Sequence, residues 1–102
     1  MLAGMAWFIK TETFRWPHSQ LLPHLRAHHR WVERLRGEGV VISSGYLVDD
    51  ESRPGGGGLL LLQAEDHAAA EALVRQDPMV LSGGVDWRLQ GWKPAVGDLG
   101  VH

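Results

Sequence analysis

The sequence has 102 residues, a formal net charge of −2 and no cysteine. This length suits one domain with a modest core, and the charge argues against nucleic acid or an anionic membrane as the main partner. Without cysteine the chain has no disulfide, no thiol nucleophile and no cysteine-based metal site, which fits a reducing cytoplasm.

The N-terminal segment lacks the features of a secretory signal, and no apolar run is long enough to span a bilayer, so we expect a cytoplasmic protein. Residues 5–13 are rich in aromatic and β-branched side chains, which predicts a first strand. Trp7 and Ile9 would share one face of this strand. Phe8 and Lys10 would share the other, and bulk on both faces favours an inner strand.

The longest predicted helix begins near Ser19 or Gln20 and ends near Arg36, just before two glycines. Pro17 precedes this helix at a position where its missing N–H is tolerated. A start at Ser19 or Gln20 keeps Pro23 within the first turn, where proline does not interrupt the hydrogen bonds.

One histidine of this helix lies in the middle of its apolar stripe. The stripe consists of Leu21, Leu25, Val32 and Leu35. At about 3.6 residues per turn, His28 falls near the centre of their arc, so its imidazole should face whatever the helix packs on. It is either a hydrogen-bonded core histidine or a functional group at the rim of a pocket. Its neighbour His29 is expected to be solvated.

Residues 40–47 form the predicted second strand, whose small residues mark either a bulge or a place where a ligand approaches the backbone. The hydroxyl groups of Ser43, Ser44 and Tyr46 are candidate donors to such a ligand. Residues 48–58 contain acids, a proline and four glycines, which predict an exposed flexible loop. Neither a Lys-Ser/Thr pair nor a helix follows these glycines, so a phosphate-binding role is disfavoured.

The rest of the chain predicts a buried strand, a second helix and a last strand. These elements span residues 59–64, 67–76 and 85–94. Pro78 disfavours helical geometry at Asp77, so Asp77 should leave the helix where its carboxylate can reach sideways. Residues 79–84 are expected to be a connection, and residues 1–4 and 95–102 are expected to be loose tails.

The order strand, helix, strand, strand, helix, strand predicts an α+β, ferredoxin-like βαββαβ domain over residues 1–102. Its four-stranded antiparallel sheet would carry both helices on one face. The other face would be bare and would keep apolar side chains, among them Trp7 or Phe8 and Trp87 or Trp92. A second copy packed sheet to sheet is the simplest cover for such a face, so the sequence predicts a homodimer.

Several short motifs, in a fixed order along nearly the whole chain, resemble the YciI (YCII-related) family of small dimeric ferredoxin-like proteins. They are His28 on a helix, Gly39 eleven residues later, a strand ending in Gly45, a glycine-rich connection, Asp77-Pro78 and a Trp-bearing last strand. The family often has arginine three residues before the histidine and proline after the glycine that ends the second strand. Leu25 and Tyr46 occupy those two positions here.

The resemblance implies a dimeric α/β barrel without a cofactor, similar to muconolactone-isomerase-like and dehydrochlorinase enzymes. It also implies that His28 and Asp77 form a catalytic pair that faces a cleft. A carboxylate bonded to one imidazole nitrogen fixes the tautomer, and the other nitrogen can then move a proton on a small carbonyl or chlorinated aromatic substrate.

Two other interpretations remain open. In the first, the protein is a non-catalytic dimer that binds or senses a small molecule, and His28 and Asp77 only hold the helix to the loop. In the second, His24 and His28 bind a metal ion from one side of the helix, although no third ligand is evident from the sequence.

Overall fold

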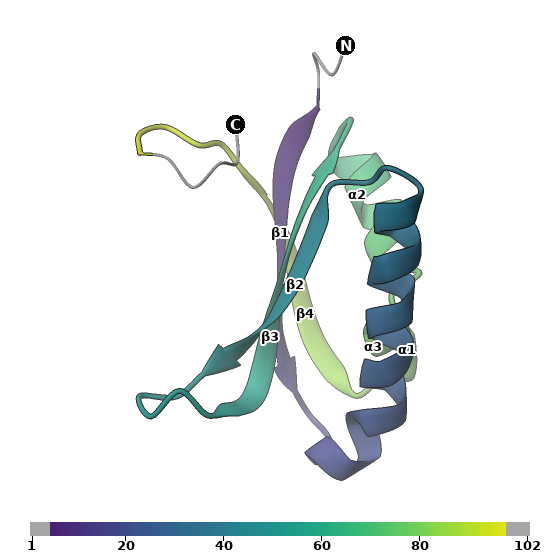
Figure 1. Cartoon of the computed structure of the whole chain (residues 1–102), viewed down its shortest axis with the longest axis vertical. Helices are drawn as coiled ribbons and strands as arrows, with labels where there is room; N and C mark the ends of the chain where they lie inside the picture. The colour runs from purple at the N-terminus through teal and green to yellow at the C-terminus, as the bar shows by residue number, and fades with distance from the viewer. Residues whose placement is uncertain (1–4, 98–102) are drawn as a thin grey trace.

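The computed structural model describes residues 5–97, in which three helices cover one face of a four-stranded antiparallel sheet (Figure 1). The elements are β1 (Ala6–Phe14), α1 (His18–Gly37), β2 (Ile42–Val48), β3 (Pro54–Ala64), α2 (His67–Val74), α3 (Pro78–Ser82) and β4 (Val85–Trp92). The strand order is β2-β3-β1-β4, which confirms the ferredoxin-like prediction. Within residues 5–97, no helix is long and apolar enough to cross a membrane. Of the tails predicted at residues 1–4 and 95–102, residues 95–97 are described and form neither helix nor strand, and the rest lie outside the described part.

The two inner strands are β1 and β3, as the bulk on both faces of β1 predicted. Phe8 and Lys10 point toward the helices and are only 5% and 1% exposed. Trp7 and Ile9 lie on the opposite face and remain partly exposed. Within residues 5–97, no helix covers this second face (Figure 1).

The predicted apolar stripe packs α1 on the sheet. Its buried residues are Leu21, Leu25, His28, Trp31, Val32 and Leu35. The predicted start at Ser19 or Gln20 is wrong by one or two residues, because α1 begins at His18. The carbonyl of Pro17 accepts the N–H groups of Gln20 and Leu21 at 3.0 and 3.2 Å and so closes an earlier first turn. Pro23 therefore lies inside α1, where it removes one helical hydrogen bond.

The predicted loop over residues 48–58 is too long, because β3 already begins at Pro54 and contains all four glycines. Gly57 and Gly58 pair with Thr13 and Glu12 of β1. A Cβ atom at Gly57 would lie 2.7 Å from the carbonyl oxygen of Glu12, so only glycine permits this strand spacing. Backbone hydrogen bonds on both sides of an inner strand stabilise glycines that would otherwise disfavour a strand.

The predicted connection over residues 79–84 contains a short helix, α3. Asp77 has extended backbone dihedrals and caps α3 by accepting the N–H of Met79 at 2.9 Å. Gly83, with φ of 77°, ends the helix in the left-handed conformation that favours glycine. The predicted second helix over residues 67–76 is two residues too long, because α2 ends at Val74. Asp77 is non-helical, as Pro78 predicted, but the sequence did not indicate that Asp77-Pro78 starts another helix.

The core consists of two apolar clusters. The larger contains Phe8, Trp31, Val32, Leu35, Ile42, Leu60, Leu62, Ala64, Ala70 and Val74, and the smaller contains Leu21, Leu25, Met79 and Val85. Polar residues interrupt the apolar sequence on each of the three segments that cross from one cluster to the other. They are Lys10 and Glu12 on β1, His28 on α1 and Asp77 before α3. The fold therefore brings four buried polar side chains together between the two clusters.

Candidate active site

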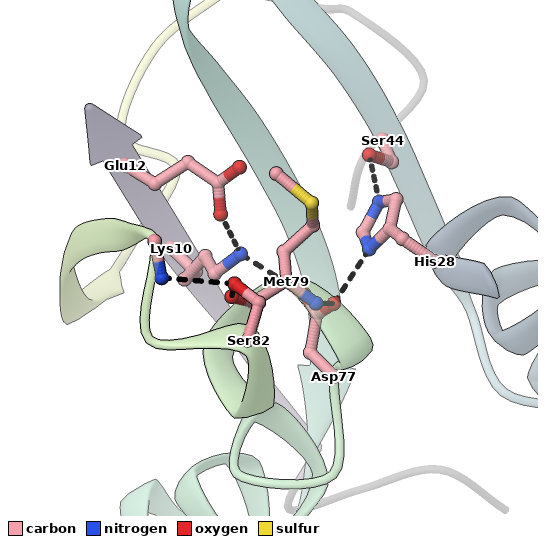
Figure 2. A network of polar contacts seen from close by, with 8 residues as sticks. Lys10, Glu12, His28, Ser44, Asp77, Met79 and Ser82 are labelled. Carbon is pink, nitrogen blue, oxygen red and sulfur yellow. Dashed lines mark hydrogen bonds and ion pairs between the residues drawn. The ribbon is translucent and has the colours of Figure 1, made fainter. Parts of the chain in front are cut away.

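His28 and Asp77 come from segments 49 residues apart and meet at the boundary between the two clusters (Figure 2). His28 Nδ1 lies 2.8 Å from Asp77 Oδ1. The same oxygen accepts the backbone N–H of Met79, so the cap of α3 also fixes the orientation of the carboxylate. Pro78 holds Asp77 in the extended conformation that this arrangement needs.

Lys10 joins the second oxygen of Asp77 to another carboxylate. Its Nζ atom donates to Asp77 Oδ2 at 2.9 Å and also donates to Glu12 Oε1 (Figure 2). The sequence alone did not indicate that Lys10 and Glu12 belong to the site. The available signal was their spacing, because residues 8, 10 and 12 share the face of β1 that carries the buried Phe8.

The groups around Asp77 determine whether its carboxyl group is ionised and, through it, which ring nitrogen of His28 carries a proton. Burial alone would raise the pKa of Asp77, but the hydrogen bond from His28 and the positive charge of Lys10 hold this pKa below its ordinary value. Asp77 is therefore ionised at neutral pH and can only accept hydrogen bonds. It follows that His28 Nδ1 carries a proton and donates it to Asp77, which leaves Nε2 as the basic nitrogen of the neutral ring.

The Nε2 atom of His28 faces Ser44 of β2, with Ser44 Oγ at 2.7 Å. Both side chains line a pocket with a volume of about 30 Å³, whose walls also include Glu12, Tyr46 and Gly58. A pocket of this volume holds ordered water but no aromatic ring. His28 is therefore both a buried core histidine and a residue of a pocket wall.

Of the two other predicted site residues, Tyr46 lines the pocket and Ser43 does not. Tyr46 lies at the rim of the pocket, and its hydroxyl group is 3.2 Å from His29 Nε2. His29 is exposed, as predicted, but it also lines the pocket. Ser43 is not among the lining residues, because alternation along β2 turns its side chain to the opposite face from Ser44.

A larger hollow of about 540 Å³ adjoins this pocket. It is lined by the aromatic residues Phe14, Trp16 and Tyr46, together with the first residues of β3. Phe14 and Tyr46 line both spaces, so the hollow and the small pocket share a wall. His28 lines the small pocket and is not among the residues that line the hollow.

Within residues 5–97, no group of three or more His, Cys, Asp and Glu side chains is arranged to hold a metal ion. The ring of His24 packs near Trp16, with ring centroids 6.1 Å apart. Both nitrogens of His28 already have protein partners, Asp77 and Ser44. The metal interpretation based on His24 and His28 therefore has no third ligand in the described region.

The family model of the YCII-related domain matches residues 5–90, which contain every helix and strand up to the last two residues of β4. The chain belongs to the YCII-related domain family. The resemblance inferred from the order of short motifs is thus confirmed. Among curated proteins, none matches the sequence significantly.

Solved structures with the same fold as this YCII-related chain include two enzymes. The first is the 5-chloro-2-hydroxyhydroquinone dehydrochlorinase TftG from Burkholderia phenoliruptrix AC1100, in complex with 2,5-dihydroxybenzoquinone. It has a TM-score of 0.69 and 21% identity, over 87% of this chain and 95% of its own. The second is SnoaB, a cofactor-independent oxygenase from Streptomyces nogalater, with a TM-score of 0.57 and 13% identity, over 96% of this chain and 99% of its own.

The de novo designed protein Foldit4 also shares the fold, with a TM-score of 0.54 and 10% identity over 89% of this chain and 98% of its own. A designed protein and two enzymes with different reactions thus have the same architecture as this YCII-related chain. Function must therefore be argued from the side chains of the site and not from the fold.

Proposed function

We propose that this YCII-related protein is an acid–base enzyme of the lyase or isomerase type, which acts through His28 and Asp77 on a small carbonyl-bearing or chlorinated ring compound. One observation carries the proposal: the ionised Asp77 holds His28 Nδ1, while His28 Nε2 faces a pocket. This arrangement gives the imidazole one fixed tautomer and one nitrogen that is available for proton transfer.

In an elimination, His28 Nε2 accepts a proton from the carbon next to a carbonyl group. The electron pair of the broken C–H bond forms a new C=C bond, and the leaving group departs with its own bonding electrons. The negative charge of Asp77 stabilises the imidazolium that forms. The proton then leaves Nε2 through the pocket, where Ser44 both donates and accepts hydrogen bonds. Acid–base catalysis of this kind contributes roughly 10²- to 10⁴-fold.

The proposed substrate class rests on the neighbouring hollow. Its aromatic walls suit a planar ring, and Phe14 and Tyr46 connect it to the pocket of His28. TftG is a dehydrochlorinase whose structure contains a dihydroxybenzoquinone, which is a small oxygenated ring. We infer that such a ring occupies the hollow here and places only its reacting atoms in the small pocket.

A second copy of the chain is the proposed cover of the open sheet face. Leu47 and Leu59 on this face are 44% and 38% exposed, and Trp7 pairs with Trp92 farther along the sheet. Burial of such side chains favours association of two sheets. Sedimentation velocity at micromolar concentration should give the mass of a dimer, and a monomer under these conditions would exclude this partner.

The test of the catalytic proposal is His28→Gln, with His67→Gln as the matched control. A panel of chlorinated hydroxyhydroquinones and related ring ketones would be assayed for chloride release and isomerisation. The first variant should lose at least about 100-fold in turnover. The control should keep most of it, because His67 is exposed at the start of α2 and lines neither the pocket nor the aromatic hollow. A His28→Gln protein that retains turnover would refute catalysis by His28.

The second candidate function is a non-catalytic binding or sensing protein. The observation that favours it is that both nitrogens of His28 have protein partners. A ligand from the same panel that binds by calorimetry, without any conversion by the wild-type protein, would support this alternative. Conversion that depends on His28 would exclude it.

A further inference from the structure

Glu12 presents a carboxylate oxygen to the pocket that no described residue uses. Its Oε1 atom accepts a hydrogen bond from Lys10, whereas Oε2 has no partner among residues 5–97 (Figure 2). Glu12 is 7% exposed and lines the same pocket as His28 and Ser44. Oε2 remains accessible from the pocket, so a ligand that enters the pocket can donate a hydrogen bond to it.

Glycine keeps the space beside this oxygen open. A Cβ atom on Gly58 would lie 3.5 Å from Glu12 Oε2 and 3.2 Å from the carbonyl oxygen of Gly45. Both glycines line the pocket, so its wall at this point is bare backbone. A ligand atom can therefore approach Oε2 from the pocket side without meeting a side chain.

The charges around the pocket favour a neutral ligand that donates hydrogen bonds over an anion. Lys10 already donates to two carboxylates, those of Glu12 and Asp77. Leu25, on the α1 wall of the pocket, adds no positive charge. A ligand carboxylate beside Glu12 would meet a like charge in a region with little solvent, whereas a hydroxyl group would form a charge-assisted hydrogen bond.

We propose that Glu12 determines substrate specificity by accepting a hydrogen bond from a hydroxyl group of a neutral phenol or enol, and that the pocket discriminates against ring carboxylates. This inference rests on the proposed function and names the substrate class of the same site. The ring stays in the aromatic hollow, and only its hydroxyl group and its reacting carbon enter the small pocket, at Glu12 Oε2 and His28 Nε2.

Binding of hydroquinone, benzoate and 1,4-dimethoxybenzene to the full chain tests this inference, with calorimetry at pH 7 as the measurement. The wild-type protein should bind hydroquinone about tenfold more tightly than either other compound, because only hydroquinone has a neutral O–H donor. This comparison needs no mutation, so it holds even if a variant of Glu12 fails to fold.

The matching variant is Glu12→Gln, which keeps the size of the side chain and removes its charge. It should lose the preference for hydroquinone over benzoate by about tenfold. Glu65→Gln, in an exposed carboxylate outside the pocket, should leave the preference unchanged.

Equal wild-type affinity for hydroquinone and 1,4-dimethoxybenzene would overturn the role of Glu12. An unchanged preference in a folded Glu12→Gln protein would overturn it as well. Both outcomes concern binding and are independent of turnover. Failure of the catalytic proposal is recognised separately, by a His28→Gln protein that still converts substrate.

Discussion

Lys10 and Asp77 are 67 positions apart in the sequence, yet Lys10 Nζ donates to Asp77 Oδ2 at 2.9 Å in the middle of the protein. Both side chains are almost completely buried, so solvent screens this ion pair very little. Through Lys10, the carboxylate that holds His28 is linked to the carboxylate of Glu12 in the pocket wall. Changes at Lys10 should therefore affect stability and site geometry together.

Lys10→Met should lower the free energy of unfolding by about 3–5 kcal/mol, because it leaves two buried carboxylates without their shared cation. Chemical denaturation measures this loss. The matched control is Arg36→Met, which breaks the exposed pair with Glu33 and should cost no more than about 1 kcal/mol. Adding Glu12→Gln to Lys10→Met should restore part of the loss. Equal stability of Lys10→Met and wild type would contradict the buried ion-pair network.

Asp77 should make stability depend on pH in the acidic range. The pKa of Asp77 is below its ordinary value in the folded protein because, although burial opposes ionisation, His28 and Lys10 favour the charged form. The unfolded chain then takes up a proton at a higher pH than the folded chain does. The contribution of Asp77 is thus complete near neutral pH and is lost as the pH falls from about 5 through the folded-state pKa.

Asp77→Asn should therefore flatten the decline of unfolding free energy below about pH 5. The comparison belongs in an Asp49→Asn background, because hydrogen bonds from the backbone N–H groups of Arg53 and Glu51 also lower the pKa of the exposed Asp49. Denaturation at several pH values gives the slopes. Parallel slopes with Asp and with Asn at position 77 would show that Asp77 does not titrate differently in the two states.

Ser44→Ala tests the hydrogen bond at the basic nitrogen of His28. If Ser44 orients Nε2, turnover should fall about fivefold, which corresponds to one hydrogen bond of roughly 1 kcal/mol. The melting temperature should change little, because Ser44 lies in an exposed part of β2. Ser43→Ala is the matched control, since this side chain does not line the pocket. An equal effect of the two variants would argue against orientation by Ser44.

Two adjacent glycines of β3 should respond differently to alanine. Gly58→Ala fills the space beside Glu12 Oε2 and should weaken hydroquinone binding. Its loss of stability should be the smaller of the two, because the added Cβ atom comes no closer than 3.2 Å to a neighbour, the carbonyl oxygen of Gly45. Gly57→Ala places a methyl group 2.7 Å from a backbone oxygen of β1 and should destabilise the sheet strongly. Thermal melts and calorimetry separate the two effects. A Gly58→Ala protein with unchanged ligand affinity would show that the ligand does not approach Oε2 from this side.

The parts of the fold that depend on local patterns could be predicted from the sequence. The stripe that contains His28 follows from helical periodicity, and the break at Asp77 follows from the proline after it. These two signals place both residues of the His28–Asp77 pair at element positions from which they can meet. Their contact distance depends on tertiary packing, which only the structure shows.

The parts that depend on pairing between distant segments could not be predicted. The predicted first strand becomes polar toward its end, where Lys10 and Glu12 lie. Such a change usually indicates that the strand approaches solvent. The burial of Lys10 and Glu12 follows from α3, whose cap carries Asp77 against β1. The glycines at 55–58 likewise predict a loop by composition, yet they belong to β3. Gly58 pairs with both β1 and β2, and Gly57 pairs with β1.

The polar boundary between the two apolar clusters has a consequence for protein engineering. Buried charges that are replaced together by well-packed apolar side chains often raise stability by about 1–4 kcal/mol. Joint replacement of Lys10, Glu12, His28 and Asp77 should fuse the clusters and raise the denaturation midpoint, while it abolishes every proposed activity. Selection for thermal tolerance alone would therefore move this chain toward an inert scaffold with the same shape.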